Sequence, residues 1–289
     1  MTAATVVASF GRQYLVETPQ HELLTCYPRG KKSEVACGDR VEIAVTGSGQ
    51  GVIEKVLPRS TLFYRSDPYR KKLIAANITQ IVAVVAAVPS FYEDLLNRCL
   101  LAAEQQGIRA LLVLNKCDLP QSAEVLDKLQ LYRGLGYPLV QLAAKRDVAP
   151  LRAVLENQTS ALVGQSGVGK STIINALLPD AQVATAEISQ ALDSGKHTTT
   201  HARLYHLDAN SHIIDSPGMQ EFGLHHLDAG EIERGFVELH PYLCHCKFRN
   251  CLHLGEPGCA VLAALAAGAI APQRYDSYRR LVTASTVKR

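Results

Sequence analysis

Two short motifs occur in this chain in an order that few protein families share. The segment Asn115-Lys116-Cys117-Asp118 fits N-K-x-D, and the segment from Gly164 to Ser171 fits G-x-x-x-x-G-K-[ST]. The second pattern is typical of a phosphate-binding loop, and the first is the pattern with which GTPases read guanine. In an ordinary GTPase the phosphate-binding loop comes first in the chain. The reversed order therefore predicts an α/β P-loop GTPase domain that is circularly permuted.

The phosphate-binding loop lies in the context that its chemistry needs. The apolar run Ala161 to Val163 precedes it, and a helical pattern begins at Thr172. A strand, a glycine turn and a helix in this order direct backbone N–H groups and a helix N-terminus at phosphate. A glycine turn before a helix, without any nucleotide, is the alternative. The residues expected to bind nucleotide here are Gly164, Gln165, Ser166, Gly167, Val168, Gly169, Lys170, Ser171 and Thr172.

Three side chains near these glycines are of the types that phosphate and Mg²⁺ require. We expect Lys170 to bridge the β- and γ-phosphates and the Ser171 hydroxyl to bind Mg²⁺. A short apolar strand then ends in Asp215-Ser-Pro-Gly218, which fits D-x-x-G. We expect Asp215 to hold Mg²⁺ through water and the Gly218 N–H to contact the γ-phosphate.

The N-K-x-D motif follows the apolar run Ala110 to Leu114, which is typical of a buried parallel strand. Ligands bind at the carboxyl ends of such strands. We expect Asp118 to accept hydrogen bonds from guanine N1–H and the exocyclic amine, which adenine does not present. Asn115 should tie this loop to the phosphate-binding loop, Lys116 should cover the base, and Cys117 takes the variable position. Alone, the motif also fits a plain turn after a strand.

Two features of the sequence bear on hydrolysis. Met219 directly follows D-x-x-G, where Ras-like enzymes have a glutamine that orients the attacking water. Because an apolar side chain cannot orient water, we expect slow intrinsic hydrolysis and a group supplied from elsewhere. A partner could supply it, or His197 in the polar segment Gly195 to Thr200, although a solvated loop histidine is an equal alternative. One of the three threonines in that segment should complete the Mg²⁺ shell. The candidate catalytic residues are His197, Lys170 and Thr199, and the sequence does not decide among Thr198, Thr199 and Thr200 for the Mg²⁺ ligand.

A second strong pattern lies near the C-terminus. Cys246, Cys251, His253 and Cys259 place three thiolates and one imidazole within fourteen residues. This donor set is typical of a closed structural Zn²⁺ site, and four protein ligands leave no open position for catalysis. Cys244 and His245 are alternative ligands by proximity. Disulfides are less favoured, because nothing at the start of the sequence resembles a secretory signal. Cytosolic proteins keep their thiols reduced and use cysteines at such spacing to bind metal.

The chain reads as three domains. Residues 1–65 contain short alternating stretches between turn residues, which predict a small all-β barrel, most simply an OB-fold. Residues 73–223 alternate apolar strands with helical segments and are expected to form the GTPase domain. Residues 224–289 are expected to be a helical zinc-binding domain. The stretches expected to be barrel strands are Thr5 to Phe10, Gln13 to Glu17, Asp39 to Val45 and Gly51 to Val56, and the C-terminal candidate helices are Ala260 to Ala271 and Gln273 to Val282.

The net charge of +3 is distributed unevenly. Residues 1–72 hold 11 Lys and Arg against 7 Asp and Glu, and residues 230–289 hold 8 against 5. Each basic cluster alone is more often a solvated face. Together with a barrel and a zinc module, they favour an RNA partner. The clusters are Arg29-Gly-Lys31-Lys32, Arg65 with Arg70-Lys71-Lys72, and Arg279-Arg280. No run reaches the length of a membrane span, so we expect no membrane partner. We also expect a cytoplasmic protein, because nothing at the start of the sequence resembles a secretory signal, and a monomer.

These motifs, in this order and over essentially the whole chain, resemble the ribosome small subunit-dependent GTPase A family (RsgA, also called YjeQ). The resemblance implies a cytoplasmic factor that binds the small ribosomal subunit and its rRNA late in maturation. It implies GTP hydrolysis to GDP stimulated by that subunit and accompanied by release. It also implies that Cys246, Cys251, His253 and Cys259 are the zinc ligands, and that the family shares an apolar residue at Met219 and a histidine at His197.

One residue departs from the usual pattern, and two other functions stay open. Ala143 replaces the serine of a second base-contacting loop at Gln141 to Lys145, which leaves that contact in question. A GTP-dependent enzyme unrelated to RNA is one alternative, and a nucleotide-gated RNA-binding scaffold with secondary hydrolysis is the other. In either case D-x-x-G leads almost directly into the C-terminal domain. We therefore expect loss of the γ-phosphate to act on that domain through Glu221 to His226.

Overall fold

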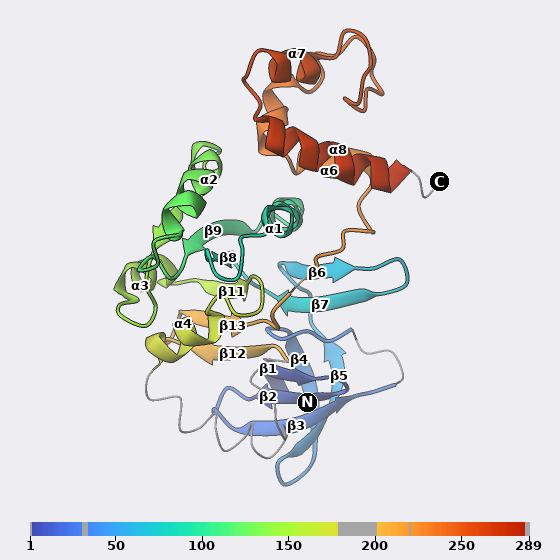
Figure 1. The fold of residues 1–289 in the computed structure, drawn as a ribbon. Coiled ribbons are helices and arrows are strands. Elements are labelled where there is room, and N and C mark those ends of the chain that lie inside the picture. The colour runs from blue at the N-terminus through green and yellow to red at the C-terminus, as the bar shows by residue number, and fades with distance from the viewer. Residues whose placement is uncertain (1, 31–33, 179–200, 220, 287–289) are drawn as a thin grey trace.

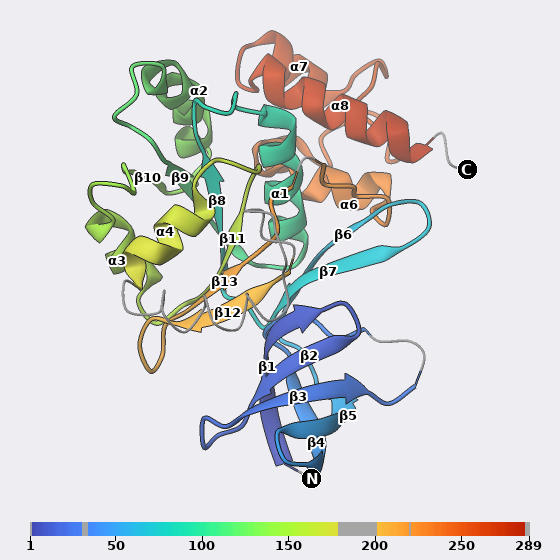
Figure 2. The ribbon, with the colours of Figure 1, turned by 60° about the horizontal axis from the view of Figure 1, so that its bottom comes forward.

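The computed structural model describes residues 2–30, 34–178, 201–219 and 221–286. Three parts follow one another in space as well as in sequence (Figure 1). The N-terminal strands form a barrel at one end, a sheet flanked by helices lies in the middle, and the C-terminal helices lie at the other end. A long β-hairpin projects from the side between them (Figure 2).

The barrel is closed from five strands with alternating burial. Val6, Val16 and Val41 point into it and are fully buried. The strands pair in the order β1-β2-β3-β5-β4 and close through β4 with β1, with β3 and β5 parallel. This arrangement agrees with the predicted OB-fold. The strands are β1 (Thr2–Phe10), β2 (Gln13–Glu17), β3 (Leu23–Pro28), β4 (Arg40–Gly47) and β5 (Gln50–Val56).

The central sheet has the order β10-β9-β8-β11-β13-β12. The first five strands are parallel, and β12 runs antiparallel to β13. Through the pair Ala8–Arg203, β12 also meets β1, so that the barrel and the central sheet are continuous. The strands are β8 (Gln80–Val85), β9 (Arg109–Leu114), β10 (Leu139–Gln141), β11 (Thr159–Val163), β12 (Arg203–His206) and β13 (His212–Asp215).

Helices cover both faces of this sheet because its strands are apolar on both sides. In β8, Ile81, Ala83 and Val85 belong to one core, and the alternating Val82 and Val84 belong to the other. The first core packs against α1 and α2, and the second packs against α3 and α4. The helices are α1 (Glu93–Gln105), α2 (Ser122–Gly134), α3 (Ala149–Leu155) and α4 (Lys170–Leu177). This is the expected α/β architecture.

The C-terminal helices pack on α1 through a buried polar network. The Arg274 guanidinium, 1% exposed, donates to Asn97 of α1 at 2.6 Å and pairs with Glu238 at 2.6 Å. The Asn97 amide also donates to Ser277 at 2.7 Å. These contacts fix the C-terminal helices against the central domain. The elements are α6 (Ala229–Arg234), the 3-10 helix η1 (Val237–Tyr242), α7 (Ala260–Ala266) and α8 (Pro272–Thr286), and the projecting hairpin is β6 (Leu62–Ser66) with β7 (Lys71–Ala76).

Candidate nucleotide site and metal cluster

The predicted nucleotide-binding motifs meet at one edge of the central sheet. Asn115 follows β9, Gly164 follows β11, and Asp215 ends β13, all at the carboxyl ends of parallel strands. The chain runs from β8 to β9 and β10 on one side, and β11 and β13 lie on the other. Such a reversal of strand order opens a crevice at the carboxyl edge where ligands bind. The permuted chain therefore builds one site from motifs in reversed order.

Two glycines of the phosphate-binding loop are required by its geometry. Gly164 has φ +144°, and a Cβ there would lie 2.3 Å from the Val84 carbonyl oxygen. Gly169 has φ +101°, and a Cβ there would lie 2.3 Å from Asn115 Nδ2. The loop can therefore lie against β8 and the N-K-x-D motif only because both positions lack a side chain.

Lys170, at the first position of α4, is folded back over the phosphate-binding loop. It is 7% exposed, and its ammonium donates to the Gly164 and Gln165 carbonyls, both at 2.9 Å. Burial lowers the pKa of Lys170, and the nearby Asp215 carboxylate opposes that shift. This places a cation over the loop beside the D-x-x-G aspartate. Ser171 lies in the first turn of the same helix.

Asn115 joins three loops. Its side chain, 2% exposed, donates to the Val168 carbonyl at 2.9 Å and accepts the Ala144 N–H at 3.0 Å. The first bond reaches the phosphate-binding loop, as the sequence predicts. The second reaches the Gln141 to Lys145 loop, where the sequence left the second base contact in question because Ala143 replaces serine. A backbone N–H therefore holds that loop in place.

The rest of N-K-x-D lines a cavity of about 270 Å³. The Lys116 ammonium donates to the Val88 and Gly167 carbonyls, at 2.6 and 2.8 Å, so its stem crosses toward the phosphate-binding loop. The Asp118 carboxylate also lines the cavity and lies 3.8 Å from the Arg146 guanidinium. The lining residues are Asn115, Lys116, Asp118, Leu119, Ala143, Ala144, Lys145, Gly167, Gly169 and Thr172. Cys117 is not among the lining residues, and its N–H donates to the Leu142 carbonyl at 3.2 Å.

The D-x-x-G motif lies directly against the phosphate-binding loop. The Ser216 hydroxyl donates to the Leu162 carbonyl, and the Met219 N–H donates to the Gly164 carbonyl at 3.1 Å. A Cβ on Gly218 would lie 2.9 Å from the Ser166 Cα. Met219 is 4% exposed and packs in the main core, and its side chain is apolar.

Several expected residues lie outside the described residues, namely His197, Thr198, Thr199 and Thr200. The structure also adds contacts that sequence reasoning missed, from the Ala144 N–H, the Val88 carbonyl and Arg146. Two of these are backbone groups, which carry no sequence signal. The only sequence signal for the contact of Arg146 with Asp118 is that Arg146 directly follows Lys145 of the second base-contacting loop.

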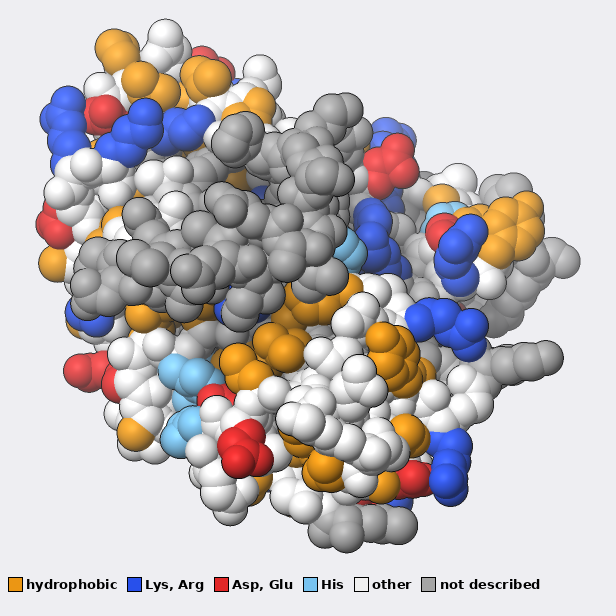
Figure 3. Space-filling view, turned by 90° about the horizontal axis from the view of Figure 1, so that it is seen from below, with side chains coloured by type: hydrophobic (Ala, Val, Ile, Leu, Met, Phe, Trp, Pro, Cys, Tyr) orange, Lys and Arg blue, Asp and Glu red, His pale blue; other side chains and the backbone are white. Residues whose placement is uncertain are grey.

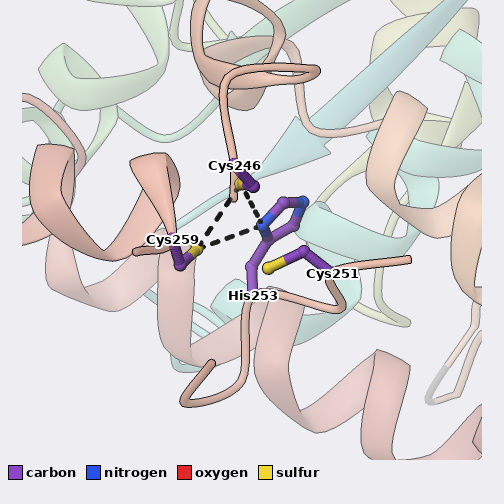
Figure 4. A group of neighbouring side chains, drawn as sticks. All are labelled: Cys246, Cys251, His253 and Cys259. Atoms are coloured by element: carbon purple, nitrogen blue, oxygen red, sulfur yellow. Dashed lines mark hydrogen bonds between the residues drawn. The ribbon is translucent and has the colours of Figure 1, made fainter. Parts of the chain in front are cut away.

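The four predicted metal ligands converge at the C-terminal end (Figure 4). One donor atom from each lies within 4.8 Å of all the others. The Cys246 and Cys259 sulfurs are 3.9 Å apart, and His253 Nδ1 lies 3.5 and 3.2 Å from them. A tetrahedral ion with metal–sulfur bonds of about 2.3 Å has sulfur–sulfur edges of about 3.8 Å. The donor set and spacing therefore fit one tetrahedral ion.

The surroundings of the cluster hold its ligands in place. The His253 Nε2 atom faces the Glu233 carboxylate at 3.6 Å, on the side away from the sulfurs. The Ala260 N–H points at the Cys246 sulfur at 3.3 Å. Although burial acts to raise it, the pKa of Cys246 is lowered by that N–H and by the neighbouring thiols, which favours the thiolate. The spare candidates Cys244 and His245 are exposed and lie outside the cluster.

Comparison with known proteins agrees with this geometry. Residues 56–225 match the RsgA GTPase family model. The chain is 57% identical over 285 residues to the small ribosomal subunit biogenesis GTPase RsgA of Nitrosospira multiformis, covering 98% of this chain and 91% of that protein. It is 51% identical to the protein of the same name from Neisseria meningitidis, covering 94% and 88%.

Two solved structures share the fold over the full length of the chain. YjeQ from Thermotoga maritima superposes with a TM-score of 0.75 at 28% identity, covering 100% of this chain and 99% of that one. YloQ, described as a circularly permuted GTPase, superposes with a TM-score of 0.70 at 25% identity, covering 100% and 96%.

Proposed function

The chain belongs to the RsgA GTPase family and is a GTP-hydrolysing enzyme, and from that premise we propose that it serves late maturation of the small ribosomal subunit. In this proposal the subunit and its rRNA bind the GTP-loaded protein and stimulate hydrolysis to GDP and phosphate, and the change of nucleotide state accompanies release. The observation that carries the proposal is the pair of hydrogen bonds that the Asn115 side chain makes, one to the phosphate-binding loop and one to the base-side loop. It brings both halves of a guanine-nucleotide site together in a permuted chain.

The described residues supply most of a phosphoryl-transfer site. In our proposal, Lys170 moves from the loop carbonyls to the β- and γ-phosphates, and Asp118 accepts the guanine hydrogen bonds. Ser171 and Asp215 provide a hydroxyl and a carboxylate, oxygen ligands that fit Mg²⁺, which would neutralise phosphate charge when bound. The Gly218 N–H would donate a hydrogen bond to the γ-phosphate. Gly218 lies against Ser166, so the motif sits close enough to the phosphate-binding loop for this role.

Water activation needs a group beyond these residues. Because Met219 is buried, it cannot orient a nucleophile, and intrinsic hydrolysis should be slow. We propose that His197 orients the water, that Thr199 completes the Mg²⁺ shell, and that binding of the subunit makes this arrangement productive. GTP hydrolysis should therefore be slow in the isolated protein and fast when the protein is bound to the subunit.

We further propose that the cluster of Cys246, Cys251, His253 and Cys259 holds one structural Zn²⁺. Three sulfurs and one nitrogen are a donor set for zinc rather than for magnesium or calcium. Four protein ligands around one tetrahedral ion leave no position open for substrate, and the Glu233 carboxylate behind His253 would orient that ligand. The ion would therefore fold the loop between η1 and α7, and so shape the C-terminal domain.

The partner surface is proposed from charge and shape. Viewed from the barrel end, Lys and Arg side chains gather in several separate groups rather than one patch (Figure 3). Contacts to a folded RNA at several points would suit such a surface. None of the helices within the described residues is long and apolar enough to cross a membrane. We propose a cytoplasmic protein that acts as a monomer.

The direct test is GTP hydrolysis with and without purified small ribosomal subunits, using Lys170→Ala as the inactive control. The proposal expects stimulation of at least about 100-fold, in line with other GTPases that receive a catalytic group from a partner. If the subunits bind the protein without changing its rate of GTP hydrolysis, the subunit is not the activator. Normal subunit maturation with a hydrolysis-dead variant would favour the nucleotide-gated scaffold instead.

A further inference from the structure

The chain that leaves D-x-x-G does not cross freely to the C-terminal helices. It runs beside the β6–β7 hairpin, which lies between the barrel and the C-terminal helices (Figures 1 and 2). The Ser66 N–H donates to the Gly223 carbonyl at 2.8 Å, and Ser66 pairs with Leu224 in a parallel bridge. The segment Glu221 to His226 is therefore joined to β6 through one bridge, at Leu224, and turns at His225 and His226.

Side chains of β6 fasten this segment at both of its ends. At the far end, the buried Ser66 hydroxyl accepts the His226 N–H at 3.0 Å and bonds the His226 Nδ1 atom at 2.7 Å. At the near end, the Arg65 guanidinium donates to the Glu221 carbonyl at 2.5 Å. Three residues of this six-residue segment, Glu221, Gly223 and His226, are thus bonded to two adjacent residues of β6.

Apolar packing also stabilises the contact between β6 and the segment Glu221 to His226. The Phe63 and Phe222 rings are both buried, with centroids 5.4 Å apart. Gly223 lies so close to β6 that a Cβ there would stand 2.2 Å from the Ser66 carbonyl oxygen. Its φ lies outside the left-handed region, so the glycine is needed for this close approach and not for its backbone conformation.

We propose that Arg65 and Ser66 are positioning residues for GTP hydrolysis, acting through the segment Glu221 to His226 on D-x-x-G. The motif is held against the phosphate-binding loop by the Met219 N–H, and only two residues further on the chain is held by Arg65. This inference rests on the proposed function, because it concerns the geometry of the same hydrolytic site. The hairpin would therefore position the hydrolytic site, in addition to the RNA contacts that its basic residues favour.

The contact should matter for hydrolysis and not for holding GDP. GDP has no γ-phosphate, so its binding depends on the phosphate-binding loop and N-K-x-D. The Gly218 N–H, in contrast, would act at the γ-phosphate, and its placement depends on where the chain after it is fixed. Displacing a group by about 1 Å at a reacting centre can cost about 100-fold in rate.

The test is Gly223→Ala in the full-length protein, with Gly134→Ala as the matched control. The added methyl at residue 223 meets a backbone oxygen and must push the segment off β6, whereas a methyl at residue 134 meets nothing within 4 Å. We expect kcat to fall about 10-fold to 100-fold for Gly223→Ala, with affinity for a fluorescent GDP analogue within about twofold of the unaltered protein. Gly134→Ala should match the unaltered protein in both measurements.

Each outcome decides one point. An unchanged kcat in a folded Gly223→Ala protein overturns the inference, as does an equal loss of GDP affinity and kcat. If that variant does not fold, Ser66→Ala, which deletes only the hydroxyl bonded to His226, carries the same expectation of lower kcat at constant GDP affinity. Absence of hydrolysis in the unaltered protein and in Gly134→Ala, with and without subunits, would instead overturn the proposed function itself.

Discussion

Replacing Asn115 by alanine should loosen the whole nucleotide site, because one side chain joins three loops. The change removes the donor to the Val168 carbonyl and the acceptor for the Ala144 N–H, both in buried surroundings. A buried polar group that loses its partner costs about 1–3 kcal/mol, so two such groups cost about 2–6 kcal/mol. The adjoining cavity, which Ala144 lines, can admit water to the freed Ala144 N–H, which favours the lower part of that range, about 2–3 kcal/mol.

Urea unfolding without nucleotide, followed by circular dichroism, measures this loss. Asn210→Ala is the control, because Asn210 is an exposed loop residue remote from the three loops. The control should differ from the unaltered protein by less than about 0.5 kcal/mol. A loss below about 1 kcal/mol for Asn115→Ala would show that the loops are held independently of this side chain, and the reasoning about the site would be wrong.

Three further predictions concern the rest of the molecule. The purified protein should contain one zinc per chain by metal analysis, and Cys251→Ser or a strong chelator should remove it and unfold the region around α7, seen as faster amide hydrogen exchange there. Arg274→Met should cost about 3–5 kcal/mol in urea unfolding, because it leaves the Glu238 carboxylate buried without its partner, and a cost near zero would mean the C-terminal helices are held by apolar packing alone. Burial, aided by the Lys71 ammonium, lowers the pKa of His226. The unfolded chain therefore takes up that proton first, and stability should decline as pH falls from about 6.5 toward the lowered pKa of the folded state. The decline in melting temperature over this range should be shallower for His226→Asn, and an equal slope in both proteins would contradict the assignment.

The parts of the site that the sequence predicts are those encoded locally. The positive φ of Gly164 and Gly169 is set within the loop between a strand and a helix, whereas their close approach to Val84 and Asn115 depends on distant segments. Local encoding also holds for the cluster of Cys246, Cys251, His253 and Cys259, whose spacing lies within one loop. The α/β class and the permuted order likewise follow from apolar runs and motif order.

The parts that could not be predicted depend on contacts between distant segments. Arg65 reads from sequence as one cation of a basic cluster, yet it bonds the Glu221 carbonyl, 156 residues away. Arg274 lies in the expected helix Gln273 to Val282 with nothing to distinguish it from the exposed Arg279, yet it is almost completely buried beside Asn97. No local pattern distinguishes such side chains from solvated ones, because the partner lies in another domain.

The strand β3 was missed for a different reason. Leu24 and Cys26 point into the barrel, but Leu23 and Tyr27 on its other face are apolar and about half exposed. Apolar residues on both faces erase the alternation that reveals a strand of a half-buried sheet. The predicted helix from Ala260 to Ala271 also ends earlier, at Ala266, because Gly268 takes a left-handed conformation with φ +75°.

The central claim is that motifs in permuted order form one guanine-nucleotide site, and Asp118→Asn tests it most directly. Titration with fluorescent GTP and xanthosine triphosphate analogues would measure both affinities. The account predicts that GTP affinity falls at least about 100-fold while affinity for the xanthine nucleotide rises, because the amide matches the altered base edge. Unchanged GTP affinity would mean that Asp118 does not read the base, and that the reversed motifs do not act together as described.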